Sequence, residues 1–379
     1  MYSAKFIIVF VCMAFLTACD SPKVNESSQE QGQSETGLKY AKRFSVVHHV
    51  NYDVLYLFGN RKNHDTTSVF MISSDSLPKE VIIKNAVWIK SPCNRIASLS
   101  SIYSAMFCEL NSADRIVAID NIDYVNEQQI ISKFKRGELK ELARGPQIDL
   151  EKTVALNPDI IFTFGMGDWE KDLDEKLRRT RIPVAISIDH LEETPLARAE
   201  WIKFFALFVN KKEKADSIFN EVERSYLSLK SQADSAKEKP TVFSEIKYSD
   251  AWYLPGGKSY VATLFNDAAA DYLWKNETQS GSLPLSFEQV YARAKDADYW
   301  INLSTVKTKK ELLSYEPRYT EFKAFKTGNL FNNTKHTNSF GYSDYWETGM
   351  IHPERILSDL IGIFHPAKRK EFYYYEQIN

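Results

Sequence analysis

The chain has 379 residues, of which 44% are hydrophobic and 26% charged, an ordinary composition for a globular protein of about two domains. Its formal net charge of -2 excludes a general electrostatic attraction to nucleic acid or to acidic membranes. We find no long basic run and no phosphate-binding loop, so we expect no nucleic-acid partner.

The N-terminal nineteen residues have the pattern of an export signal. Lys5 precedes the apolar run IIVFVCMAFL, which has the length of a secretory signal and is too short to span a bilayer. The run ends in LTAC, which resembles the lipobox of bacterial lipoproteins, and an ordinary signal peptide is the alternative. We predict a lipoprotein signal peptide over 1–19, lipidation of Cys19, and a disordered polar tether over 20–40.

The remaining elements fall into four parts. Residues 41–90 hold short β-like runs such as FSVVHHV and YDVLYLF, and we expect a β-rich N-terminal extension there. Over 91–195, strands such as RIVAID and DIIFTF alternate with helices such as DLEKTVAL, which predicts a parallel, helix-covered sheet. Residues 196–237 show only helical spacing, and over 238–379 strands such as TVFSEI alternate with helices again. The order is therefore an α/β lobe, a long helix and a second α/β lobe.

A weak internal repeat supports two related lobes. DLEKTVALNPDIIF corresponds to SFEQVYARAKDADYWI, so that Glu151 aligns with Glu288 and Ala155 with Ala292, both at an offset of 137 residues. In each copy a buried strand follows the helix. The alternative is chance similarity between two helix–strand units.

The chain resembles the substrate-binding lipoproteins of ABC importers for iron–siderophores, haem and cobalamin. The matching pieces are NRIASLSSIYSAMFCELNSADRIVAID, LEKTVALNPDIIFTFG, WYLPGGKSYVATLFNDAAADYLW, LSFEQVYARAKDADYWINL and IHPERILSDLIGIFHP. The resemblance implies a class III periplasmic binding protein, with two three-layer α/β lobes joined by a long rigid helix and the ligand in the cleft. It also implies a monomer that binds a small-molecule metal chelate, docks on ABC permease subunits with their ATPase and needs no cofactor. The chain departs from many relatives at LARGPQ, where they carry a Gly-rich turn.

Loops at the carboxyl ends of the strands supply the expected ligand site. Two of these loops have nearly the same sequence, YSDAW and YSDYW. Their aromatic rings suit the flat apolar faces of large chelates. Arg144 and Lys258 are the expected cationic partners of an anionic chelate, and solvated surface charges are the alternative. For the tryptophans the alternative is a place in a lobe core. The predicted ligand-binding residues are Ser101, Tyr103, Tyr124, Arg144, Trp169, Tyr248, Trp252, Tyr253, Lys258, Tyr345 and Trp346.

Glu151 and Glu288 match the two glutamates by which binding proteins of this family dock onto arginines of the transporter. Complementary charge of this kind gives orientation and speed more than affinity. The alternative is a glutamate favoured at a helix start by the helix dipole. We predict permease docking for both residues.

Other chemistry has less support in the sequence. Cys93 and Cys108 either form a disulfide or stay as buried thiols, and the spacing leaves both open. The seven histidines are scattered, so we expect no metal site of the protein's own. We find no catalytic motif and expect no enzyme, although a carboxylate pair of Asp250 and Asp344 stays open.

We favour a ferric siderophore as the ligand, with cobalamin or haem as alternatives. We expect a protein that is lipid-anchored to the bacterial envelope on the periplasmic side of the membrane, with exposure at the cell surface as a scavenger left open.

Overall fold

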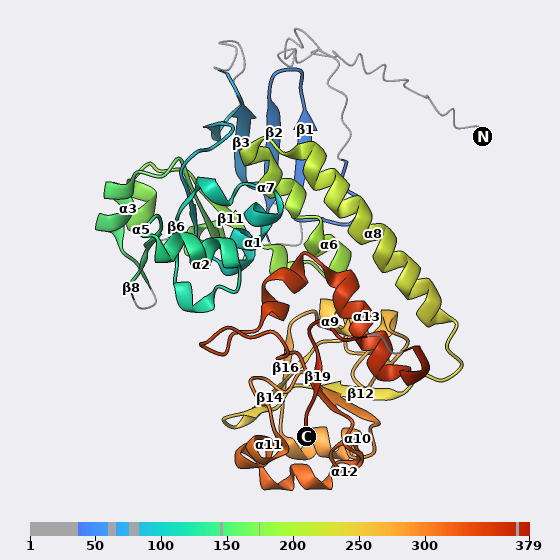
Figure 1. Ribbon diagram of the computed structural model, residues 1–379. Coiled ribbons are helices and arrows are strands. Elements are labelled where there is room, and N and C mark those ends of the chain that lie inside the picture. The colour runs from blue at the N-terminus through green and yellow to red at the C-terminus, as the bar shows by residue number, and fades with distance from the viewer. Residues whose placement is uncertain (1–36, 60–65, 76–82, 145–146, 174, 369–370) are drawn as a thin grey trace, which may run out of the picture.

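The structure is a computed structural model that describes residues 37–59, 66–75, 83–144, 147–173, 175–368 and 371–379 (Figure 1). The predicted signal peptide, the predicted lipidation site Cys19 and most of the predicted tether lie outside these residues. No helix in the described part is both long and apolar enough to cross a bilayer.

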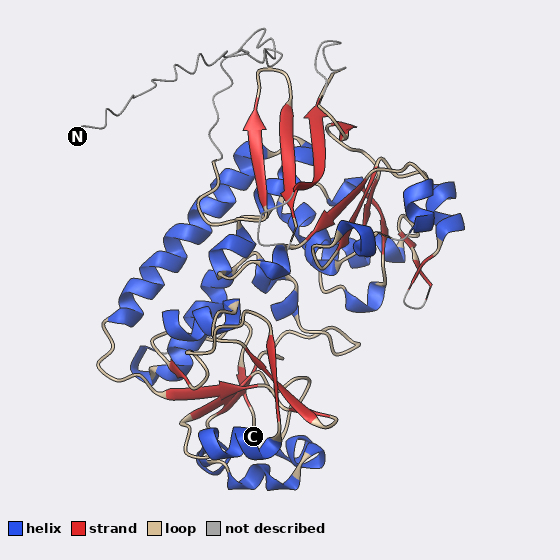
Figure 2. Cartoon of the chain, turned by 180° about the vertical axis from the view of Figure 1, so that it is seen from behind, coloured by secondary structure: helices blue, strands red, loops and turns tan. Residues whose placement is uncertain are grey.

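Residues 44–90 form a separate four-stranded sheet with the order β1-β2-β3-β4. Its strands are β1 (Phe44–His48), β2 (Asp53–Phe58), β3 (Thr66–Ser73) and β4 (Ala86–Lys90). β1 to β3 are antiparallel and β4 is parallel to β3. The side chains of Phe44 and Phe70 pack against the aromatic rings of Trp201 and of α7 (Ile202–Val209), so the extension rests on the helices that connect the lobes. Figure 2 shows this sheet as a unit apart from the sheet of the first lobe.

The first lobe is built on a parallel five-stranded sheet with the order β11-β10-β5-β6-β7. Strands β5, β6 and β11 are short apolar runs with almost every side chain buried, as expected for a sheet covered by helices on both faces. The strands are β5 (Ile96–Ser98), β6 (Ile116–Ile119), β7 (Lys140–Glu141), β10 (Ile160–Phe164) and β11 (Val184–Ser187). The helices are α1 (Ser101–Glu109), α2 (Gln128–Lys135), α3 (Leu150–Leu156), α4 (Trp169–Asp172) and α5 (Glu175–Arg179). A two-stranded hairpin of β8 (Ala143–Arg144) and β9 (Gln147–Ile148) precedes α3.

Three helices connect the lobes: α6 (Pro195–Ala199), α7 (Ile202–Val209) and α8 (Lys212–Asp234). α7 is buried on nearly all sides, and its phenylalanines pack against Phe162 of β10. Asn210 adopts the left-handed conformation that ends α7 and turns the chain into α8. The 23 residues of α8 span about 35 Å and run from the first lobe to α13 of the second (Figure 1).

The second lobe has a five-stranded sheet with the order β15-β12-β17-β18-β19, parallel except at β19. The strands are β12 (Thr241–Ser244), β15 (Asp271–Tyr272), β17 (Tyr299–Ile301), β18 (Leu330–Asn332) and β19 (Glu376–Gln377). The helices are α9 (Tyr260–Asp267), α10 (Phe287–Ala294), α11 (Lys309–Tyr315), α12 (Lys323–Thr327) and α13 (Pro353–Phe364). A second, antiparallel sheet consists of β13 (Lys247–Tyr248), β14 (Ala251–Pro255) and β16 (Ser282–Leu285).

The internal repeat extends to the helix caps. Asp149 caps α3 by accepting a hydrogen bond from the backbone of Lys152, and Ser286 caps α10 in the same way through Gln289. These two caps are again 137 residues apart. Glu151 and Glu288 are therefore the second residues of equivalent helices.

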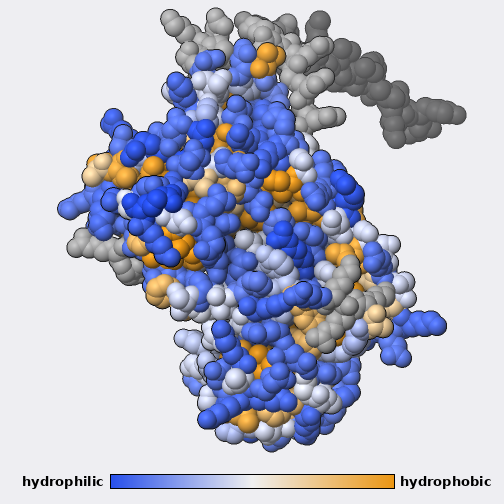
Figure 3. Space-filling model, viewed as in Figure 1, coloured by the Kyte–Doolittle hydropathy of each residue, from blue (hydrophilic) through white to orange (hydrophobic). Residues whose placement is uncertain are grey.

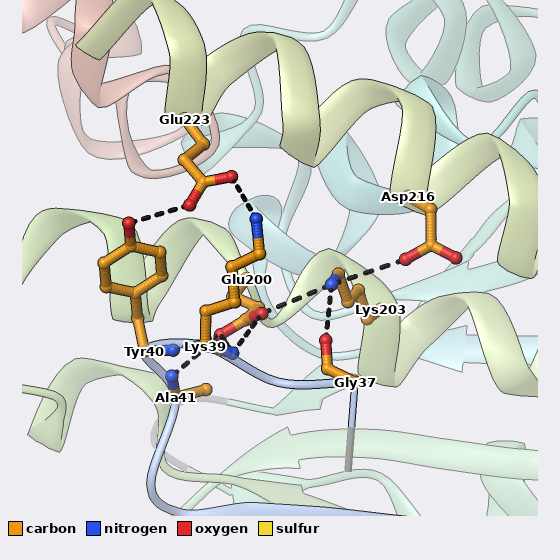
Figure 4. Close-up of polar contacts among 8 residues, drawn as sticks. All are labelled: Gly37, Lys39, Tyr40, Ala41, Glu200, Lys203, Asp216 and Glu223. Carbon is orange, nitrogen blue, oxygen red and sulfur yellow. Dashed lines mark hydrogen bonds and ion pairs between the residues drawn. The ribbon is translucent and has the colours of Figure 1, made fainter. Parts of the chain in front are cut away.

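The first described residues are bound to the connecting helices by a buried carboxylate. The Glu200 side chain is fully buried and accepts hydrogen bonds from the backbone N–H groups of Lys39, Tyr40 and Ala41 at 2.9, 2.8 and 2.9 Å (Figure 4). Lys39 and Tyr40 also reach Glu223 of α8 with their side chains. The predicted disordered tether over 20–40 is thus wrong for its last residues, because the acceptor that orders them lies 160 residues away in the sequence.

Candidate functional site

A segment of the second lobe, residues 338–347, reaches across to the strand-end loop 121–127 of the first lobe. We call this segment the clasp. The Glu347 carboxylate accepts hydrogen bonds from the backbone N–H groups of Asn126 and Glu127 at 2.7 and 2.9 Å. It also accepts one from the side-chain amide of Asn126 at 3.1 Å. These bonds join the two lobes at the edges where their parallel strands end.

Two further contacts extend the clasp. The side-chain amide of Asn338 donates to the backbone carbonyls of Asp123 and Val125 at 2.8 and 3.1 Å. The rings of Tyr124 and Tyr342 meet edge to face, with centroids 4.7 Å apart. The clasp is therefore held by the backbone, by amide groups and by aromatic packing at once.

Two ionisable groups at this interface have shifted pKa values. Glu347 is only 1% exposed, and burial raises the pKa of its carboxyl to about 7 although the hydrogen bonds from residues 126 and 127 oppose the shift. Burial lowers the pKa of His352, but hydrogen bonds to Glu109 of the first lobe and to Glu354 outweigh it and raise that pKa to about 9. Both shifts favour protonation while the lobes are in contact.

Trp252 was predicted to face the ligand, and the structure shows that this prediction is wrong. Its indole is fully buried, donates to the Ser244 carbonyl at 3.0 Å, and packs against Trp300. YSDAW is a β13–β14 hairpin with a turn at Ser249, and side chains alternate along a strand. Trp252 therefore points into the lobe while Tyr253 points outward.

Tyr345 and Tyr103 are also buried, against the prediction that they contact ligand. Tyr345 lies in the short helix η5 (Asp344–Trp346), where its ring packs on Tyr374 and Tyr375. The Tyr103 hydroxyl donates a hydrogen bond of 3.4 Å to the Asp189 carboxylate. YSDYW thus buries its second tyrosine, whereas YSDAW buries its tryptophan.

The other predicted ligand residues stay predictions. Tyr124 and Trp346 are half-exposed at the edges joined by the clasp. Tyr248, Tyr253 and Lys258 are exposed on the second lobe, and Ser101 begins α1. The backbones of Arg144 and Trp169 lie in β8 and α4, but their side chains are outside what the structure describes.

Sequence reasoning missed a group of buried and half-buried polar residues between the lobes, which we call the polar cluster. Its members come from strand ends and from the two helices that meet between the lobes: Asp189, Arg198, Ser244, Glu245, Tyr260 and Asn302. The Arg198 guanidinium on α6 lies 3.4 Å from the Asp189 carboxylate and stacks over the ring of Tyr260 at 4.5 Å. Tyr260 begins α9, so this contact joins the connecting helix α6 to the second lobe.

The backbone at the polar cluster is strained. Glu245 and Asn302 directly follow β12 and β17 and have φ values of +63° and +60°, which is unfavourable for a glutamate. Burial raises the pKa of Glu245 to about 8, so its carboxyl is mostly neutral at pH 7. A polar residue placed directly after a buried strand was the sequence signal for both positions.

Several apolar side chains are exposed at the same edges. Phe164 ends β10 of the first lobe and Met166 follows it two residues later; each is 61% exposed, and Phe340 of the clasp is 62% exposed. On the face shown in Figure 3, apolar residues otherwise form small separate groups within a hydrophilic surface. The strand-end edges thus offer aromatic surface to a bound molecule.

The two predicted docking glutamates are exposed on equivalent helices. Glu288 forms an ion pair with Arg318 at 3.1 Å, and this arginine also stacks on the ring of Phe287. Glu151 has no ion-pair partner among the described residues. Their docking role stays a prediction.

Cys93 and Cys108 are free buried thiols, which resolves the alternative left open by their spacing. Burial raises the pKa of Cys93 to about 12, so the thiol is unreactive. Within the described ranges, no three His, Cys, Asp or Glu side chains gather in a way that would hold a metal ion.

Two α/β lobes that are joined by helices and meet at their strand ends define a two-lobed solute-binding protein. A family model described as periplasmic binding protein matches residues 96–336, so the chain belongs to this family and the predicted fold class is confirmed. The chain is 28% identical over 359 residues to an uncharacterized lipoprotein of Methanocaldococcus jannaschii, covering 88% of this chain and 83% of the relative. It is 25% identical over 203 residues to a vitamin B12-binding protein of Vibrio parahaemolyticus, covering 53% and 68%. A periplasmic haem-binding protein of Pseudomonas aeruginosa has a similar fold, with a TM-score of 0.57, 17% identity and coverage of 76% and 98%.

Proposed function

We propose that the protein is the substrate-binding lipoprotein of an ABC importer, which captures an iron–siderophore or related metal chelate between its lobes and delivers it to the permease. Membership of the periplasmic binding protein family supports solute capture. The observation that carries the choice of ligand is the aromatic surface at the strand ends of both lobes, at Phe164, Phe340 and Trp346.

Exposed aromatic rings at facing edges are best explained by a ligand that covers them. Each such ring removes a large apolar area from water when it is covered, and large chelates present flat faces of matching shape. Phe164 lies on the first lobe and Phe340 on the second, so a single ligand between them would contact both lobes. This is the arrangement needed to report occupancy through the spacing of the lobes.

The anchor and the permease contact belong to the same proposal. Cys19 would carry the lipid, and a relative named as a lipoprotein supports this assignment. Glu151 and Glu288 would each meet a cationic group of one permease subunit, and their equivalent positions on α3 and α10 support a symmetric contact.

Cobalamin and haem are the second candidate ligands. The relatives named as vitamin B12-binding and haem-binding proteins favour them, and both molecules present large flat faces. A visible absorbance band of the purified protein separates the three ligands, because haem, cobalamin and catecholate iron have different spectra.

Tryptophan fluorescence during titration with a ferric tris-catecholate, haemin and cyanocobalamin tests the proposal. We expect saturable quenching by one of them without turnover. Trp346→Ala should weaken that binding about twofold to tenfold, since stacking on an aromatic ring contributes on the order of 0.5–1.5 kcal/mol. Trp88→Ala is the matched control, because Trp88 is equally exposed, at 45% against 46%, but lies on the N-terminal sheet. Absence of saturable binding to all three molecules, or their chemical conversion, would contradict the proposal.

A further inference from the structure

The polar cluster contains hydrogen-bond donors that lack acceptors. Among the described residues, Arg198 Nε, Asn302 Nδ2 and Ser244 Oγ are buried without a hydrogen-bond partner of good geometry, and Tyr260 Oη, which lies beside Arg198 and Tyr345, has no acceptor for its own proton. The nitrogens of Arg198 and Asn302 are donors only, and the two hydroxyls each carry a proton to donate. A buried donor without a partner is destabilising, and so many in one region call for an acceptor.

The polar cluster also carries positive charge that is only weakly compensated, so both its charge and its donors favour an anionic acceptor. Arg198 is 6% exposed, and among the described residues its one ion pair is a 3.4 Å contact with Asp189. That carboxylate is shared, because it also accepts a hydrogen bond from the Ser187 hydroxyl at 2.8 Å. Glu245 does not compensate the arginine, since its carboxyl is mostly neutral at pH 7.

A bare metal cation does not fit this arrangement. A cation needs several acceptor atoms gathered around it, whereas Arg198 Nε and Asn302 Nδ2 are donors only, and the described residues hold no group of three His, Cys, Asp or Glu side chains suited to a metal. An anionic oxygen fits, because a guanidinium and a hydroxyl make their strongest hydrogen bonds to such groups.

We infer that Arg198 and Tyr260 bind an anionic oxygen of the ligand, such as a carboxylate or a catecholate oxygen, and so select anionic chelates over uncharged ones. Arg198 belongs to α6 of the connection between the lobes, and Tyr260 to α9 of the second lobe. An oxyanion bound by both residues ties the ligand to the connection and to the second lobe. The inference rests on the proposed function and adds the charge of the ligand to it.

Binding of two ferric chelates of opposite character tests the inference: an anionic tris-catecholate and an uncharged tris-hydroxamate. Arg198→Gln should weaken binding of the tris-catecholate at least tenfold and binding of the tris-hydroxamate less than threefold. Tyr260→Phe, which keeps the ring under Arg198, should weaken the tris-catecholate about threefold to tenfold.

Two control variants report the effect of similar losses elsewhere. Arg115→Gln removes an arginine that donates to the Cys93 carbonyl at 3.1 Å, at the opposite edge of the first sheet. Tyr272→Phe removes a buried hydroxyl that donates to the Pro255 carbonyl at 2.6 Å. Neither control should change the preference between the two chelates.

A second measurement separates this inference from the proposed function. Citrate, at an ionic strength matched with chloride, should raise the melting temperature of the wild-type protein but not of Arg198→Gln. If citrate behaves so and no chelate binds, the anion site stands and the chelate proposal is wrong. If Arg198→Gln binds the tris-catecholate as tightly as the wild type, the inference is wrong and the proposed function stands. If neither citrate nor any chelate has an effect on the wild type, both are wrong.

Discussion

Raising the pH from 6 to 9.5 should release the clasp from the first lobe. Burial raises the pKa of Glu347 to about 7 from an ordinary 4.5, and the carboxylates around His352 raise its pKa to about 9 from an ordinary 6.5. A group whose pKa is raised in the closed arrangement stabilises that arrangement when protonated. The contribution of Glu347 is complete below pH 4.5 and is lost by pH 7, and that of His352 is complete below pH 6.5 and is lost by pH 9.

The loss of clasp stability follows from the pH range between the ordinary and the raised pKa of each group, which we call its window. One pKa unit corresponds to about 1.4 kcal/mol, so the part of the Glu347 window above pH 6 contributes about 1 kcal/mol. The His352 window of about two and a half units contributes up to about 3 kcal/mol, because part of the shift comes from Glu354 of the same lobe. Asp344 also acts on Glu347, and Arg355 also acts on His352. The clasp should therefore weaken by up to about 4 kcal/mol, or up to roughly a thousandfold in its open population.

Hydrogen exchange of the Asn126 and Glu127 amides measures this release, because both donate to Glu347. After correction for the intrinsic pH dependence of exchange, their protection should fall steeply between pH 6 and 9.5. The amide of Tyr40 is the control, since it also donates to a buried carboxylate but lies away from the clasp. His352→Gln should remove most of the pH dependence. Protection at residues 126 and 127 that is constant or rises with pH would refute the reasoning.

Three further outcomes follow from the structure. Glu200→Gln should lower the exchange protection of the amides over 39–41 by about tenfold to a hundredfold, because the three N–H groups lose a charged acceptor; unchanged protection would mean that the segment is held by other contacts. Trp252→Ala should lower the free energy of unfolding by about 3–5 kcal/mol in denaturant titrations, whereas Trp346→Ala should change it by less than about 0.5 kcal/mol. Glu288→Lys should reduce transport in reconstituted vesicles without changing chelate affinity, and Arg318→Ala should leave both intact; a loss of affinity in Glu288→Lys would argue against docking.

The fold was predictable because its signals are local. RIVAID and DIIFTF are runs of apolar residues that are long enough only for a buried strand, and β6 and β10 lie there. Ser286 before FEQV is a capping pattern, and it begins α10. Each of these features depends on fewer than ten consecutive residues, so the sequence alone identifies it.

The candidate site was only partly predictable, for two physical reasons. Turn residues around YSDAW suggested a loop, but a two-residue turn at Ser249 and Asp250 makes a hairpin, and strand alternation then buries Trp252. The polar cluster brings Arg198 together with Tyr260 of the second lobe, and nothing near either residue signals the other. Pairings across lobes depend on how the two sheets approach, which no short segment determines.

The contacts between the lobes also constrain how a ligand enters. α8 packs on α13 and α6 packs on α9, so one side of the interface is held by helices continuous with the connection. The clasp is held instead by contacts between two loops: Glu347 and Asn338 of the clasp bind the loop 121–127 of the first lobe. Opening on the clasp side breaks a few hydrogen bonds but returns a buried carboxylate to water, and this gain in hydration offsets much of the cost. Rotation about the helical side with release of the clasp is therefore the least costly route to the polar cluster, and a stiff α8 keeps that rotation small.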